Sequence, residues 1–233
     1  MAWLLRCIGA ARSDGVHAPE PRRTGEKRKI LSGISARRFF VMLLGNFLLG
    51  IGVALFKVSS MGMAPSNNLI MAISNTLGVS FSIMSVVCCT FYFIVEFALG
   101  RELINVGTFV NWFTVGPTAG YFMDIIEKNH LVRDSFPAHL VVMGCGVLVL
   151  GLGCSMYQSS RLGISPYDSL SIILSERRGY KYFWCRLFTD FLCVSVAWAL
   201  GGVVGLGTLV CAFGMGPFIS FFDVHISRKL CGS

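Results

Sequence analysis

The amino-acid sequence contains one apolar unit twice, and each copy is interrupted by a break rich in glycine and proline. In the first copy Gly50-Ile-Gly52 leads into Met-Gly-Met-Ala-Pro at 61–65. In the second copy Gly151-Leu-Gly153 leads into Leu-Gly-Ile-Ser-Pro at 162–166, and matching positions are 101 residues apart. A duplicated hydrophobic unit with Gly/Pro-interrupted segments at matching positions is typical of transporters, whose binding sites lie at such interruptions.

The composition excludes an ordinary soluble domain. Hydrophobic residues make up 54% of the chain and charged residues only 14%, whereas about a quarter of a soluble domain is charged. We therefore expect a single membrane domain over residues 37–226, with repeat one at about 39–126 and repeat two at about 138–225. A tail at 227–233 is expected to be cytoplasmic.

The net charge of +8 is concentrated ahead of the first apolar run. Nine of the 20 Lys and Arg residues lie within residues 1–38. A basic flank on an apolar span indicates a cytoplasmic location, so we do not expect a nucleic-acid partner. Residues 1–36 carry proline, glycine and charge without periodicity, which predicts a disordered, basic, cytoplasmic N-terminal segment.

Six apolar runs have about the length that a transmembrane helix needs: 39–57, 80–99, 104–125, 138–157, 184–203 and 205–224. Two shorter segments, 65–77 and 166–178, each begin at a proline, which suits the first turn of a helix. At 1.5 Å per residue, 13 residues extend about 20 Å, which is less than the roughly 30 Å hydrocarbon core. We interpret these segments as half-helices.

The fold class predicted is all-α and polytopic, with two tandem repeats of three transmembrane helices plus one short half-helix. The alternative is four plus four spans. Each arrangement leaves 17 basic residues inside and 3 outside with both termini cytoplasmic, so the positive-inside rule does not separate them. Six spans make the two repeats inverted, whereas eight make them parallel.

Ionisable residues inside apolar runs are costly and need a reason. Arg186 and Asp190 are four residues apart, so a helix places both on one face. They form either an interfacial anchor or a coupling site for a proton or cation. Glu96 lies near the end of its run, where it is either shielded by Arg101 or a second coupling group.

Polar residues also follow the two breaks, which consist of Gly62, Pro65, Gly163 and Pro166. Asn67, Asn68 and Asp168 stand in the first turns of the half-helices. The helix dipole alone explains an Asp there. Alternatively, two facing half-helix starts form a binding site for a substrate.

The sequence carries no phosphate-binding loop, nucleophile elbow or zinc-protease motif. Most of its nine cysteines fall within apolar runs, where cysteine is a small buried hydrophobe. We therefore expect no enzymatic activity, no catalytic residue, no metal and no cofactor.

The glycine and proline pattern of residues 39–225 resembles the YczE-like branch of the YczE/YyaS/YitT bacterial integral membrane proteins. The elements that carry the resemblance are the two breaks, Gly107-Thr108, Gly116-Pro117, Thr189-Asp190 and Val204-Gly-Leu-Gly-Thr208. The resemblance implies a multi-pass protein of the bacterial inner (plasma) membrane, and it implies no activity.

Two functions fit these features. The first is a secondary transporter or permease of a small polar or amphipathic molecule, whose identity the sequence does not give. The second is a non-transporting partner or regulator of another membrane complex. Beyond the lipid bilayer, the expected partners are a second copy of the chain or such a complex.

Overall fold

The computed structural model describes residues 35–129, 135–180 and 182–231, and it is helical throughout these ranges, without strands. The segment 1–36, predicted to be disordered, lies outside the described residues except for its last two positions. The longer helices are α3 (Ala36–Val58), α5 (Phe81–Leu99), α6 (Val106–Lys128), α7 (Phe136–Ser159) and α9 (Tyr182–Ala199). A 3₁₀ turn at Arg101–Leu103 links α5 to α6.

The last helical run extends from Leu206 to Cys231 and changes its winding along the way. It contains three α-helical parts, α10 (Leu206–Leu209), α11 (Met215–Phe222) and α12 (Arg228–Cys231). Two π-helical stretches connect them, Val210–Gly214 between α10 and α11 and Asp223–Ser227 between α11 and α12. The tail predicted at 227–233 begins inside this run. Its Cys231 is buried against α3 and α7.

The two short helices form over the residues that the sequence indicates, as α4 (Pro65–Leu77) and α8 (Pro166–Arg178). Each has proline in its first turn. Each ends at a glycine in the left-handed conformation, Gly78 with φ of 66° and Gly179 with φ of 69°. Glycine adopts this conformation without steric cost and so ends a helix.

Four described helical runs are long and apolar enough to cross a membrane: α3, α5, α7 and Leu206–Cys231. Polar residues dilute the other two long helices. Asn111 of α6 faces inward and donates to Asn46 of α3 over 2.7 Å, and α9 carries Arg186 and Asp190. At 13 residues, neither α4 nor α8 is long enough to span the hydrocarbon core, which favours the six-span prediction.

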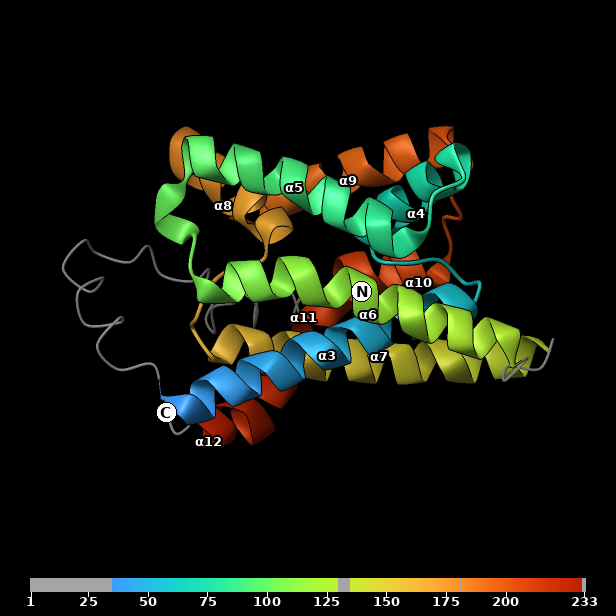
Figure 1. The fold of residues 1–233 in the computed structure, drawn as a ribbon, viewed down its shortest axis with the longest axis horizontal. Helices are drawn as coiled ribbons and strands as arrows, with labels where there is room; N and C mark the ends of the chain where they lie inside the picture. The colour runs from blue at the N-terminus through green and yellow to red at the C-terminus, as the bar shows by residue number, and fades with distance from the viewer. Residues whose placement is uncertain (1–34, 130–134, 181, 232–233) are drawn as a thin grey trace, which may run out of the picture. The chain divides into compact units, whose positions relative to one another are not determined.

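Helix α3 is central to the packing because it contacts both α6 and α7 (Figure 1). It crosses α7 where two glycines meet. A Cβ atom added to Gly45 would lie 2.9 Å from the carbonyl oxygen of Gly153, and one added to Gly153 would lie 2.9 Å from that of Gly45. Further along, Gly52 of α3 faces Leu150 of α7, so the two helices run antiparallel.

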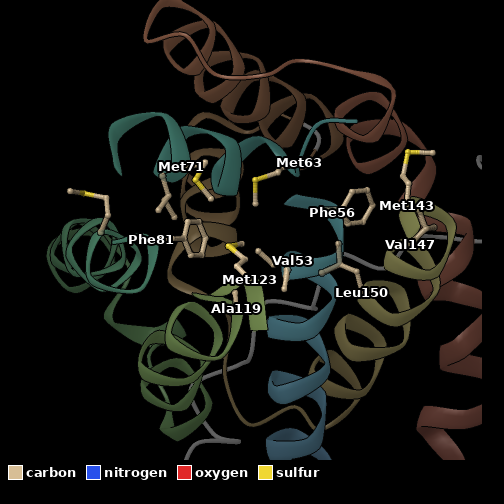
Figure 2. Packing of buried hydrophobic residues seen from close by; sticks show 13 residues of the cluster. Val53, Phe56, Met63, Met71, Phe81, Ala119, Met123, Met143, Val147 and Leu150 are labelled. Carbon is tan, nitrogen blue, oxygen red and sulfur yellow. The ribbon is translucent and has the colours of Figure 1, made fainter. Parts of the chain in front are cut away.

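A hydrophobic cluster surrounds one end of α3 (Figure 2). Phe56 and Val53 of α3 pack there with residues of α6 and α7, while Met71 from α4 and Phe81 from α5 close the cluster from the other side. This cluster fixes the half-helix α4 to the body of the domain.

Each break contacts the start of the last helix in the other half of the chain. The Gly107 amide donates to the Leu162 carbonyl over 2.8 Å, and the Gly207 amide donates to the Met61 carbonyl over 2.7 Å. These reciprocal bonds join positions that the repeat makes equivalent. Helices α3 and α7, which carry the two Gly-x-Gly pairs, run antiparallel. The internal repeat itself stays a prediction.

Local conformation also matches between the two halves. Ser60 and Arg161, 101 residues apart, both have positive φ, 53° and 56°. The preceding serines form the same contact: Ser59 Oγ donates to the Phe56 carbonyl, and Ser160 Oγ donates to the Tyr157 carbonyl. Equivalent sequence positions therefore occupy equivalent local structures.

The basic residues divide unequally between the two ends of the helices. Nine lie in the described residues at the end where α3 begins and α5 and α7 finish: Arg37, Arg38, Arg101, Arg161, Arg177, Arg178, Arg186, Arg228 and Lys229. The opposite end has Lys57 and Lys128. By the positive-inside rule, the first end is expected to face the cytoplasm.

The glycine contact between α3 and α7 predicts that Gly153→Ala destabilises the protein. The new Cβ would lie within 3 Å of backbone atoms of α3, and such overpacking costs about 1–3 kcal/mol. We expect the melting temperature of the detergent-solubilised protein to fall by several degrees. Gly144→Ala on the same helix, where a Cβ has no neighbour within 4 Å, is the matched control and should not lower it.

The six-span arrangement predicts that Asn129, at the end of α6, faces the outside. In a variant without native cysteines, Asn129→Cys should react with a membrane-impermeant maleimide on intact cells. Arg178→Cys, at the end of α8, should react only after permeabilisation. Labelling in the reverse pattern would contradict the predicted orientation.

Candidate functional site

An ion cluster joins the start of α8 to the first half of α9. The Arg186 guanidinium pairs with the Asp168 carboxylate through Nη1, and its Nε lies 3.4 Å from Oδ2 of Asp190. The Tyr167 hydroxyl donates to the other Asp190 oxygen over 2.6 Å. The Arg186 guanidinium also lies over the Tyr167 ring, 4.7 Å from its centroid. One arginine is therefore shared by two carboxylates.

Local structure accounts for each member of the cluster. Asp168 and Tyr167 stand in the first turn of α8, directly after Pro166. Arg186 and Asp190 are one turn apart on α9, so they project from the same face. A bond between the Ser171 and Thr189 hydroxyls, 2.9 Å long, also links α8 to α9.

The charges of the cluster do not cancel. With all three groups ionised, two carboxylates and one guanidinium leave a net charge of −1. Asp190 is buried, with 7% of its side chain exposed, whereas Arg186 and Asp168 retain 31% and 25%. The cluster therefore has an enclosed carboxylate connected to a partly exposed ion pair, an arrangement suited to taking up one positive charge.

Glu96 of α5 is fully buried close to this cluster, and neither of its carboxylate oxygens has a hydrogen-bond partner among the described residues. The Ser169 hydroxyl of α8 lies beside it. Arg101 does not shield it. The Arg101 guanidinium lies over the Phe97 ring, 4.2 Å from its centroid, and its Nε donates to the Phe97 carbonyl.

A separate pocket of about 110 Å³, lined mainly by apolar surface, adjoins α4. Asn68, which is 3% exposed, lines it, and its Nδ2 has no partner among the described residues. The remaining lining residues come from the end of α3, the first break, α4 and the segment after α9: Phe56, Lys57, Ser60, Gly62, Met63, Met71, Asn75, Gly201, Gly202 and Val203. Asn67 is half-buried and does not line this pocket.

The substrate residues predicted from the sequence thus lie in two places. Asp168 contacts Arg186 near the start of α9, whereas the Asn68 pocket is lined by Gly201 just beyond the end of α9. Fifteen residues of mostly helical chain separate Arg186 from Gly201, which corresponds to about 20 Å along the helix axis. Figure 1 accordingly shows α8 and α4 at opposite ends of α5 and α9.

The breaks themselves serve close backbone contact. Gly62, with φ of 100°, and Gly163, with φ of 153°, have conformations that favour glycine. A Cβ atom added to Gly62 would lie 2.9 Å from the amide nitrogen of Gly205. A Cβ atom added to Gly163 would lie 2.7 Å from the amide nitrogen of Thr108. Pro65 and Pro166 then begin the half-helices.

Sequence reasoning predicted the pair of Arg186 and Asp190 but missed two features of the cluster. For Asp168 the sequence suggests a helix-dipole role or a ligand contact, and the structure shows a pair with Arg186. Tyr167, which donates to Asp190, has no role in the sequence-based hypotheses. The signal available was the short turn between two predicted helices, because such a hairpin brings their facing sides together. Among the described residues, no group of three or more His, Cys, Asp or Glu is placed to hold a metal ion.

Comparison with known proteins identifies relatives that are themselves uncharacterised. The chain is 23% identical over 185 residues to the uncharacterised membrane protein YczE of Bacillus subtilis, covering 79% of this chain and 84% of that protein. It is 24% identical over 190 residues to the B. subtilis uncharacterised protein YyaS, covering 80% and 94%.

An uncharacterised protein of Haemophilus influenzae is 25% identical over 190 residues, covering 81% of this chain and 84% of the relative. No solved structure matches the chain significantly. The resemblance to YczE-like proteins is confirmed, and the apolar helices agree with a membrane protein. Residues 36–224 match the model of a family of unknown function, DUF6198, and the chain belongs to that family.

Proposed function

We propose that the protein is a secondary transporter of the bacterial inner membrane, with both termini in the cytoplasm, that moves a small polar or amphipathic molecule. The observation that carries the proposal is the sharing of Arg186 between Asp168 and Asp190 within a membrane domain. Intramembrane ionisable groups are rare and costly, and they mark ion or substrate pathways.

The cluster is suited to coupling because it can gain one positive charge at little electrostatic cost. Protonation of Asp190 changes the net charge from −1 to zero and leaves the pair between Arg186 and Asp168 in place. Since Asp190 belongs to α9 and Asp168 to α8, the strength of the contact between these helices depends on that proton. A change in protonation can therefore bias the position of the half-helix.

The Asn68 pocket supplies a place for a small polar substrate. It lies at the end opposite the nine clustered basic residues, and in this proposal that end faces the outside. The unpartnered Nδ2 of Asn68 can donate to an acceptor on the substrate, and Met63 and Met71 provide adaptable apolar contact. In this proposal the substrate site and the coupling cluster are coupled through α9, which reaches both.

The electrostatics predict that Arg186→Gln destabilises the protein strongly. Loss of the guanidinium leaves the buried Asp190 carboxylate without a counter-charge, and breaking a buried pair costs about 3–5 kcal/mol. The partial exposure of Arg186 places the expected loss near the lower end of that range. The double variant Arg186→Gln/Asp190→Asn should recover part of the lost melting temperature, and additive effects would show that the two residues do not interact.

Transport itself is tested in proteoliposomes that contain a pH-sensitive dye, by adding a panel of small polar and amphipathic molecules under an imposed pH gradient. We expect at least one compound to cause proton movement in wild-type vesicles. Asp190→Asn should reduce this movement to the level of protein-free vesicles. Asp124→Asn, an exposed carboxylate of α6, is the matched control and should retain it.

Two results would contradict the proposal. If Asp190→Asn folds and moves protons like the wild type, the cluster does not couple. If no compound causes flux while the protein co-purifies with one membrane complex, the alternative function as a non-transporting partner is favoured.

A further inference from the structure

We propose that Glu96, Ser169 and Tyr157 form a binding site for a single positive charge, a sodium ion or a proton, distinct from the Arg186 cluster. The inference deepens the proposed function by naming where the coupled ion binds. Its test measures binding at equilibrium, so it can succeed or fail independently of transport.

The site begins with three polar atoms that the structure leaves unsatisfied. Both carboxylate oxygens of Glu96 and the hydroxyl of Tyr157 are buried without a hydrogen-bond partner among the described residues. Glu96 is 0% exposed and Tyr157 is 2% exposed. A buried carboxylate with no partner is unfavourable by several kcal/mol, so it is expected to bind a cation or hold a proton.

Glu96 faces α8. Residues one turn before and one turn after it on α5, Tyr92 and Gly100, lie against Tyr167 and Ile173 of α8. This places Glu96 against the turn of α8 that carries the fully buried Ser169. Tyr157 is supplied by α7, and its hydroxyl interacts electrostatically with Glu96. The Ser169 hydroxyl donates its proton to the Pro166 carbonyl over 2.8 Å, which leaves its lone pairs free for a cation. Carboxylate and hydroxyl oxygens are the donors that hard cations prefer.

No described cationic side chain neutralises Glu96. Arg186 is committed to Asp168 and Asp190, and Arg101 lies over Phe97. The ionisable groups facing Glu96 from neighbouring elements are Asp168 of α8 and Tyr157 of α7. Arg177 of α8 has its guanidinium directed at the Leu99 carbonyl. Helix α4 contains no ionisable residue. The ionisable residues of α6 lie in its last turns: Tyr121, Asp124, Glu127 and Lys128.

The repeat gives this location a second, independent support. Ser169 and Tyr157 stand 101 residues after Asn68 and Phe56, two of the residues that line the pocket beside α4. The matching serine contacts to Phe56 and Tyr157 show that the local backbone is the same in both places. The position matching Glu96 is Ala197. The second half of the chain therefore places Ser169 and Tyr157 at the positions that correspond to two lining residues of the Asn68 pocket.

The experiment measures thermal unfolding of the purified full chain in detergent, in sodium, potassium or choline chloride at equal ionic strength, at about pH 6 and about pH 8. A ligand that binds only the folded state raises the melting temperature. If the site binds sodium, we expect sodium to raise the wild-type melting temperature by several degrees over choline. Glu96→Gln should abolish the shift and Tyr157→Phe should reduce it.

If the site holds a proton, the salts should behave alike and the melting temperature of the wild type should fall between pH 6 and pH 8. The sign follows from linkage. A carboxyl that is protonated when folded and ionised when unfolded loses stability as the pH rises. Glu96→Gln should remove this dependence as well, because the amide does not titrate.

Glu176→Gln is the matched control, since Glu176 is an exposed residue of α8. It should keep whichever dependence the wild type shows. If Glu96→Gln retains the wild-type response to both sodium and pH, or if the wild type responds to neither, the proposal is wrong. Glutamine is nearly isosteric with glutamate in both variants. The quantity compared is the change in melting temperature between salts or pH values within one variant, so a general loss of stability does not obscure the result.

Discussion

The structure depends on how the two breaks satisfy their backbone hydrogen bonds. A helix interrupted at membrane depth exposes amide and carbonyl groups that the hydrocarbon does not solvate, so the protein itself must supply partners. The Met61 carbonyl of the first break accepts from Gly207, and the Leu162 carbonyl of the second accepts from Gly107. Each half thus completes the interrupted backbone of the other. Each break therefore depends on the other half of the chain for a backbone partner.

Glycine makes these contacts possible, and it is also what the sequence displays most clearly. The short helices α4 and α8 could be predicted to the residue, because proline starts them and glycine ends them. The close crossing of α3 and α7 is a different matter. Gly45 and Gly153 can be identified in the sequence, but their neighbouring residues do not indicate that the two glycines contact each other. Partner choice between helices depends on long-range packing, which periodicity does not encode.

The candidate site shows the same division. The four-residue spacing predicted the contact between Arg186 and Asp190, since it is fixed by helical geometry. The addition of Asp168 required the relative placement of α8 and α9, and the position of Arg101 over Phe97 required the turn after α5. The hypothesis of one site between two half-helix starts assumed that the starts face each other. The first turns of α4 and α8 do share a hydrophobic cluster, through Leu69 and Tyr167. Their polar side chains diverge, because Asn68 lines a pocket beside Gly201 and Asp168 pairs with Arg186.

Comparison of the two halves indicates what divergence has added. The residues that match Asp168, Arg186 and Asp190 in the first half are Asn67, Ser85 and Cys89, none of which carries a charge at neutral pH. Charge was therefore acquired, or retained, in one half only. The two sites differ accordingly: the Asn68 pocket is lined by Lys57 and contains no carboxylate, whereas the Arg186 cluster contains two. Under the transport proposal, the carboxylates of the second half are the groups that can exchange a proton, and the first half has no carboxylate at the matching positions.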